Sequence, residues 1–180
     1  MSSESTRLIP FGMIADTCSA DAFRREYNET LGRAIHEQFV LGRTVDSQRR
    51  AENDPALSAW EELREDIRES NRQQADHIPI KIRAIGCALA EQSVPGDSVT
   101  RFSPKEIELL ARMEHSRWNA ERLLAGWRYG TPSNKDKRIS ENLAPWEDLY
   151  DSIRDYDRHA VEKIPEFLKH VRPALKVTRK

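Results

Sequence analysis

Aromatic and arginine side chains gather on both sides of Gly126 and have the chemistry of a binding site for a planar anion. Trp118 and Arg122 precede this glycine, and Trp127-Arg128-Tyr129 follows it. Aromatic faces stack planar rings, and guanidinium groups form paired hydrogen bonds with phosphate or other anions. The sequence therefore predicts a site for a nucleotide-like molecule here, with Arg158 as a further cation.

His115, Trp118 and Arg122 follow one another at intervals of three and four residues. This spacing places them on one stripe of a helix. His115 is either a ligand contact or a hydrogen-bonded core histidine, and the sequence leaves both interpretations open.

Other polar residues do not predict catalysis or a metal site. The five histidines are scattered and show no arrangement typical of a catalytic triad. Asp151, Asp155 and Asp157 lack the spacing and the central glycine of a calcium loop. Glu114 and His115 are adjacent and point in different directions from a helix, which disfavours a shared metal. We therefore expect a protein that is not an enzyme and has neither cofactor nor metal.

The composition disfavours nucleic acid and membrane as partners. The net charge is -1, with acids and bases interleaved, whereas nucleic-acid binding needs a concentrated basic surface. The sequence contains no apolar run long enough for a membrane span. Cys18 and Cys87 are isolated and favour reduced thiols in a cytoplasmic protein.

A helix from Pro104 to Gly126 must position most of these residues. Ser103 is a suitable N-cap, Glu106 completes a capping box, and Gly126 suits a left-handed C-terminal position. Apolar residues at helical spacing predict the buried stripe of this helix, namely Leu109, Met113, Ala120 and Leu123.

The pattern changes after Gly126. Residues 127–129 and 138–146 predict two strands of a short antiparallel hairpin, because polar turn residues lie between them. A final helix is expected from Leu149 to about Val171. Pro165 should either kink this helix or mark the meeting of two helices.

The chain contains an internal repeat. Residues 60–79, WEELREDIRESNRQQADHIP, align without gaps on residues 146–165, WEDLYDSIRDYDRHAVEKIP, with eight of twenty positions identical. A weaker match upstream places His36 on His115 and Phe39 on Trp118. Because Trp60 and Trp146 occur in both copies, they favour core packing. Trp127 and Tyr129 have no aromatic counterparts in the first copy, which favours a specialised function for them.

The repeat predicts a mainly α fold with a short antiparallel β-hairpin, in which two helix–hairpin–helix units are related by a pseudo-twofold axis. The expected segments are an N-terminal extension at 1–20, a degenerate first repeat at 21–92, a linker at 93–102, a second repeat at 103–172 and a basic tail at 173–180.

Several short motifs together resemble the repeat of ryanodine receptors, the RyR domain, which is also found in stand-alone or fused bacterial proteins. The second half carries most of them, and the first half carries two: His115-x-x-Trp118, Gly126-Trp127-x-Tyr129-Gly130, Lys135-Asp136, Leu143-x-Pro145-Trp146, Asp157-Arg158, Pro55-x-Leu57-x-x-Trp60 and Ser70-Asn71-Arg72. The resemblance covers roughly residues 21–172 and adds Asp157 to the expected site. Leu8 to Gly12 also resembles the junction at which an NAD-binding domain precedes a RyR-like domain in longer bacterial proteins.

The resemblance implies recognition of an adenine- or NAD-derived nucleotide. The expected ligand-binding residues are His115, Trp118, Arg122, Trp127, Arg128, Tyr129, Asp157 and Arg158. The alternative is a protein-interaction or gating domain that acts through its helical faces, as a homodimer or with a channel or NAD-binding domain as partner. A concave pocket with converging arginines favours the ligand, and a flat aromatic patch favours the partner.

Overall fold

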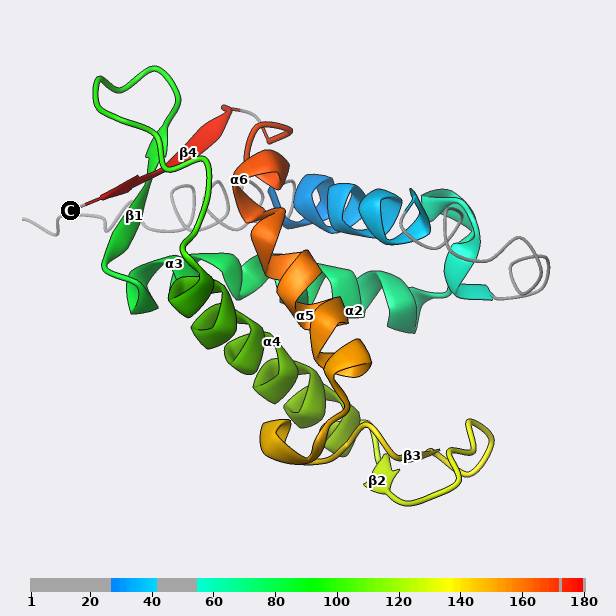
Figure 1. Cartoon of the computed structure of the whole chain (residues 1–180). Coiled ribbons are helices and arrows are strands. Elements are labelled where there is room, and N and C mark those ends of the chain that lie inside the picture. The colour runs from blue at the N-terminus through cyan, green and yellow to red at the C-terminus, as the bar shows by residue number, and fades with distance from the viewer. Residues whose placement is uncertain (1–26, 42–54, 172, 180) are drawn as a thin grey trace, which may run out of the picture.

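The computed structural model describes residues 27–41, 55–171 and 173–179, and helices make up most of them (Figure 1). The expected N-terminal extension at 1–20 lies outside the described residues. Residues 27–41 form the first described helix. The remaining elements are three 3-10 turns, five helices and four strands, in the order η1 (Pro55–Leu57), η2 (Trp60–Glu62), α2 (Glu65–Asp76), α3 (Ile78–Ala84), β1 (Cys87–Glu91), α4 (Pro104–Leu124), β2 (Arg128–Tyr129), β3 (Ile139–Ser140), η3 (Trp146–Asp148), α5 (Asp151–Glu162), α6 (Ile164–Phe167) and β4 (Leu175–Arg179).

The mainly helical fold is confirmed, and the chain does contain a small antiparallel sheet, but its strands are not those expected. Strand β1 pairs with β4, with Cys87 opposite Arg179 and Glu91 opposite Leu175. The segment expected to be a basic tail therefore supplies a strand. Its partner β1 lies far away in sequence, so no turn residues next to either strand could have predicted the pairing.

The hairpin predicted between residues 127–129 and 138–146 is wrong in its direction. Strands β2 and β3 pair in parallel, with Arg128 opposite Ile139. The intervening loop reverses twice, because Asn134 and Ile139 form an antiparallel bridge of their own. Arg138 takes a positive φ of 53° just before β3. After the second reversal the chain runs in the same direction as β2.

Two helices meet at the proline near the C-terminal end, as one of the two alternatives predicted. Helix α5 ends at Glu162 and α6 begins at Ile164, with Pro165 in its first turn. Proline is tolerated there because the first N–H groups of a helix have no partner within it. Helix α6 ends at Phe167, earlier than the expected Val171.

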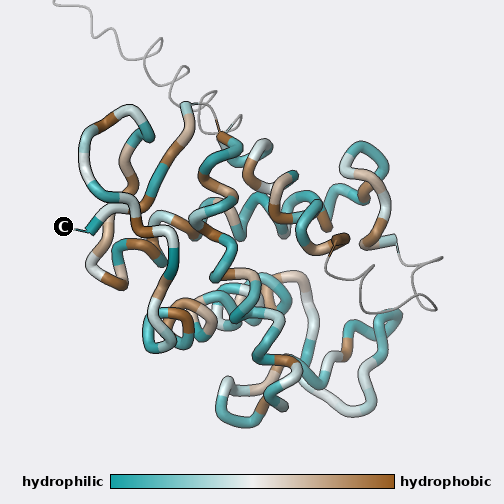
Figure 2. The backbone as a smooth tube through the Cα atoms, turned by 45° about the horizontal axis from the view of Figure 1, so that its top comes forward, coloured by the Kyte–Doolittle hydropathy of each residue, from teal (hydrophilic) through white to brown (hydrophobic). Residues whose placement is uncertain are grey.

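The core is built mostly from one face of each helix, and α4 and α5 pack against each other within it. Figure 2 shows hydrophobic and hydrophilic positions alternating along the helices. In Figure 1, α4 runs from the end of the molecule that holds β1 and β4 to the end that holds β2 and β3. The largest fully buried apolar side chains are Leu31, Ile78, Ile82, Leu110, Leu168, Val161, Val171 and Val177.

The buried stripe predicted for α4 is wrong at three of its four residues; Met113 is partly buried against the core, whereas Leu109, Ala120 and Leu123 are exposed. Leu109 and Leu123 are 44% and 58% exposed, whereas the buried residues are Leu110, Ala111, Glu114 and His115. Apolar spacing identifies the wrong face because two of the four buried side chains are polar. Their burial is offset by ion pairs and hydrogen bonds with other elements.

A buried ionic network joins α4 to the helices of the first half. Lys81 on α3 contacts Glu114 at 2.5 Å, and Arg117 bridges Glu114 and Glu121 at 2.8 and 2.7 Å. Ser70 on α2 donates a hydrogen bond to Glu121. The two halves are therefore joined by paired charges as well as by apolar packing.

Candidate functional site

Local capping places the predicted site residues at the end of α4. The Ser103 side chain accepts a hydrogen bond from the Glu106 backbone N–H, and Glu106 accepts one from the Ser103 backbone, so the predicted capping box is confirmed. Gly126 has a φ of 79°, as predicted for a residue that ends a helix. The next backbone N–H, that of Trp127, donates to the Arg122 carbonyl at 2.9 Å. This bond turns Trp127 back toward α4.

Arg122 lies between two indole rings. Its guanidinium carbon is 5.5 Å from the Trp118 ring centroid and 5.3 Å from that of Trp127. Both distances are within the range of cation–π attraction. Among the described residues, Arg122 has only a 3.9 Å ion contact with Glu121 and makes no side-chain hydrogen bond. Its N–H donors are therefore available to an anion.

His115 is buried beneath this aromatic cluster. Its side chain is 5% exposed, and its ring lies 6.1 Å from that of Trp118 and 5.7 Å from that of Trp146. Nε2 is 2.8 Å from the Ala144 carbonyl oxygen, and Nδ1 is 3.5 Å from Asp157 Oδ2. Each ring nitrogen thus has an acceptor beside it, which favours the doubly protonated imidazolium, whereas the Asn119 amide nitrogen at 3.0 Å from Nε2 opposes a proton there.

Burial, hydrogen bonds and nearby charges together set the pKa of His115. Burial lowers the pKa of His115, but hydrogen bonds to Asp157 and the Ala144 carbonyl and the charges of Asp157 and Glu114 outweigh it, so the pKa lies above its ordinary value. Burial raises the pKa of Asp157, and His115 opposes that shift. Asp157 thus contacts His115, and the His115 ring in turn packs against Trp118.

Asn119 belongs to the same polar group and was missed by sequence reasoning. Its side-chain nitrogen is 3.0 Å from His115 Nε2 and 3.3 Å from the Ala144 carbonyl oxygen. The sequence could have predicted this contact, because Asn119 follows His115 by four residues and therefore lies on the same helical face.

Arg128 and Tyr129 lie on β2 and are exposed, with Tyr129 at 62%. The chain places them beside Trp127, but in the described part of the chain no hydrogen bond, ion pair or ring contact joins them to Trp118 or Arg122. They flank the cluster that Arg122 forms with the two indoles.

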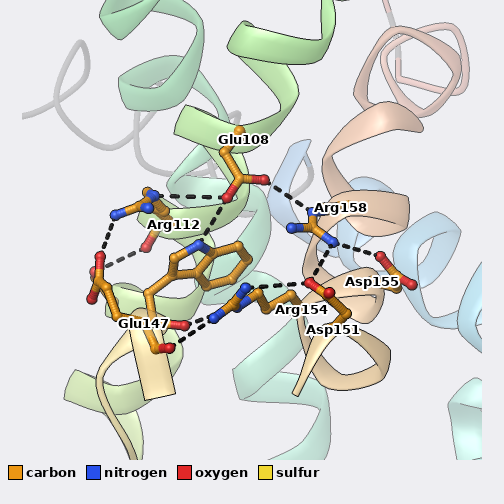
Figure 3. A network of polar contacts seen from close by, with 9 residues as sticks. Glu108, Arg112, Glu147, Asp151, Arg154, Asp155 and Arg158 are labelled. Atoms are coloured by element: carbon orange, nitrogen blue, oxygen red, sulfur yellow. Dashed lines mark hydrogen bonds and ion pairs between the residues drawn. The ribbon is translucent and has the colours of Figure 1, made fainter. Parts of the chain in front are cut away.

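Arg158 packs against Trp146, and Figure 3 shows its contacts with Glu108 and Asp155. Its guanidinium is 5.8 Å from the Trp146 ring centroid, and its Nε donates to Glu108 at 3.0 Å. Glu108 also accepts the Trp146 indole N–H at 2.9 Å. Arg112 and Arg154 approach the same indole at 5.9 and 5.8 Å. Since Trp146 is only 6% exposed, this network packs a core tryptophan.

Within the described parts of the chain, no group of three or more histidine, cysteine or acidic residues is placed to hold a metal ion. None of the helices described there is long and apolar enough to span a membrane.

The fold and the site define a mainly helical module with an aromatic and arginine cluster at the end of its longest described helix. The family model of the RyR domain matches residues 99–175. The resemblance to the RyR domain that the motifs from His115 to Arg158 predict is therefore confirmed for this segment. The matched range contains the whole of the predicted second repeat at 103–172 and begins after the first repeat. No curated protein matches the chain.

Proposed function

We propose that the chain is a non-enzymatic, cytoplasmic RyR-type module that binds a nucleotide-like molecule, adenine- or NAD-derived, at the end of α4. The observation that carries this proposal is the position of Arg122 between Trp118 and Trp127, at 5.5 and 5.3 Å. A guanidinium held by two aromatic rings keeps its planar set of N–H donors in one orientation. Such a group pairs with a phosphate while a neighbouring indole stacks the base.

The neighbouring residues fit the same ligand. Arg128 is exposed and forms no ion pair with another described residue, so it supplies a second cation for a diphosphate. Tyr129 offers a further exposed aromatic face. His115 and Asp157 hold Trp118 from beneath, and Arg158 acts only at the Trp146 network. We therefore assign the direct contacts to Trp118, Arg122, Trp127, Arg128 and Tyr129.

Titration calorimetry against AMP, ATP, ADP-ribose and NAD tests the proposal. We expect saturable heat with at least one of them in the wild type, and its loss in Trp127→Ala with the fold retained by circular dichroism. Tyr150→Ala is the matched control, because Tyr150 is 83% exposed and its side chain makes no cap hydrogen bond. Absence of heat from every nucleotide, with folded wild-type protein, would contradict the proposal.

A second candidate function is a protein-interaction or gating domain, including self-association. Leu123 and Leu124 at the end of α4 are 58% and 90% exposed, and Tyr129 is also exposed. Exposed apolar side chains of this size are typical of partner surfaces when they are contiguous. Sedimentation velocity decides between the candidates: a dimer that Leu124→Glu dissociates favours this function, and a monomer that binds nucleotide favours the first.

We also propose that the two halves are pseudo-twofold repeats. Equivalent residues make equivalent contacts, because Trp60 and Arg72 donate to Glu29 at 2.8 and 2.7 Å just as Trp146 and Arg158 donate to Glu108. Likewise, Nε2 of His36 lies 2.9 Å from the Ser58 carbonyl oxygen, as Nε2 of His115 does at Ala144. The aromatic cluster around Arg122 is then a specialisation of the second copy.

A further inference from the structure

A concave region lies at the opposite end of α4 from the aromatic cluster. It is a hollow of about 880 Å³ between residues 98–102, the junction of α5 and α6, and β4. Figure 1 shows the segment between β1 and α4 passing near α6 and β4. None of the predicted ligand-binding residues lines this hollow. Its volume falls in the range of small-molecule sites, roughly 300 to 1,000 Å³.

The floor of the hollow is apolar. Phe102, Pro165 and Val177 line it and are buried, and Ile107 and Leu175 are half-buried beside them. This floor comes from four separate parts of the chain. A planar or aliphatic body resting on it would remove further apolar surface from water, which is the main source of small-molecule affinity.

The wall formed by residues 98–102, together with the segment that precedes it, is held in place by β4. The Val99 N–H donates to the Val177 carbonyl at 2.7 Å. Lys176 is 7% exposed, and its Nζ donates to the Val94 and Gly96 carbonyls at 2.6 and 2.8 Å. These bonds pre-form the hollow, so a ligand would not have to order this segment.

The rim carries more positive than negative charge. Lys163 is paired with Glu166 at 3.2 Å, and Lys176 is bound to carbonyl oxygens. Arg101 and Lys169 also line the hollow, are exposed, and make no ion pair or side-chain hydrogen bond with another described residue. Glu162 is the remaining acid on the rim. Two cations next to an apolar floor complement an anion that has an apolar body.

We propose that this hollow binds a small organic anion, with its apolar body on Phe102 and Pro165 and its charged group between Arg101 and Lys169. Such a site is distinct from the nucleotide site at Arg122. A ligand here would contact α4 near its first turn and both helices at the α5–α6 junction. It would thus bridge the two ends of the RyR-matched segment.

Anilinonaphthalene sulfonate is a suitable probe, since it joins an apolar ring system to a sulfonate. We expect saturable fluorescence enhancement with the full chain, and weaker binding of its uncharged analogue phenylnaphthylamine. Amide shifts in NMR spectra should cluster at Val99 to Phe102 and at Leu175 to Val177. Arg101→Glu combined with Lys169→Glu should weaken binding about tenfold or more, because one charge-assisted hydrogen bond is worth about that factor.

The matched control combines Arg83→Glu with Lys137→Glu, which makes the same change of net charge at exposed residues that do not line the hollow. This control should bind like the wild type. The proposal is overturned if binding is not saturable, if the shifts cluster at Trp118 and Trp127 instead, or if both double variants lose affinity equally. Failure here would leave the nucleotide proposal intact, because that proposal is tested by calorimetry with Trp127→Ala.

Discussion

Lys81 and Glu114 form a buried ion pair between the two halves of the chain, with 2.5 Å between Nζ and Oε2. Their side chains are 1% and 4% exposed. Burial raises the pKa of Glu114, but the charges of Lys81 and Arg117 outweigh it and leave this pKa below its ordinary value. Glu114 is therefore ionised and holds α3 to α4.

Glu114→Gln should destabilise the protein strongly, because it leaves the Lys81 ammonium buried without a counter-charge. Removing one partner of such a pair costs about 3 to 5 kcal/mol. Urea denaturation measures this loss. Glu62→Gln is the control: Glu62 is exposed and unpaired among the described residues, so a change within about 0.5 kcal/mol is expected. Equal losses in both variants would contradict the role of the pair.

Trp60→Phe and Trp146→Phe should cost similar free energies of unfolding. Each removes an indole N–H that donates to a carboxylate, at 2.8 Å to Glu29 and at 2.9 Å to Glu108. Hydrogen bonds to charged groups contribute about 1.5 to 3 kcal/mol. Trp118→Phe is the control, because it makes the ring smaller without removing a hydrogen bond: the Trp118 indole N–H has no hydrogen-bond partner among the described residues. A loss of unfolding free energy in only one of the two variants would contradict the proposal that the two halves are equivalent.

Asp157→Asn should lower the pKa of His115. The hydrogen bond and the charge of Asp157 are two of the contributions that raise this pKa against the effect of burial. Titration of the His115 ring by NMR measures the change. Asp155→Asn is the matched control, since Asp155 contacts Arg158 on the same helix. An unchanged His115 titration in Asp157→Asn would show that Asp157 does not control it.

The same variant should alter the dependence of stability on pH. A raised folded-state pKa means that the native protein binds more protons than the unfolded chain. The contribution of His115 is therefore complete below its ordinary pKa of 6.5 and is lost as the pH rises through the folded-state value. Melting temperatures measured upward from pH 6.5 should fall less in Asp157→Asn than in the wild type.

The contribution of Glu106 to stability should depend on pH in the opposite direction to that of His115, because it is lost as the pH falls. Its hydrogen bond with Arg179, followed by that with the Ser103 backbone, lowers the pKa of Glu106 from 4.5 to about 2. Its stabilising contribution is present above pH 4.5 and is lost as the pH falls toward 2.

Glu106→Gln should therefore reduce the fall in melting temperature between these two pH values. At neutral pH this variant should lose the ion pair with Arg179 but keep the capping box, because a glutamine at this position also accepts the Ser103 backbone N–H. Glu141→Gln provides the control, because the Glu141 side chain is exposed and has no partner among the described residues. A steep acid transition that Glu106→Gln leaves unchanged would assign the loss to other carboxylates.

Features that depend on neighbouring residues were predictable from the sequence. The cap at Ser103 and the positive φ at Gly126 each follow from hydrogen bonding within one turn of the chain, whereas Pro165 left two alternatives open, a kinked helix or a meeting of two helices. The repeated tryptophan-to-proline segments also predicted that residues 60–79 and 146–165 would contain the same order of elements. The position of Trp118 and Arg122 on one helical face follows from their spacing alone.

Features that depend on where distant elements meet were decided only by the tertiary structure. The pairing of β1 with β4, and the burial of Glu114 against Lys81, join residues that are far apart in sequence. The apolar pattern of α4 identified the wrong face, because a charge can be buried when another element supplies its partner. Asp157 and Arg158 are adjacent, yet one faces His115 and the other Trp146. Local spacing determines the direction of each side chain from its helix, and the packing of α5 on α4 determines what it meets.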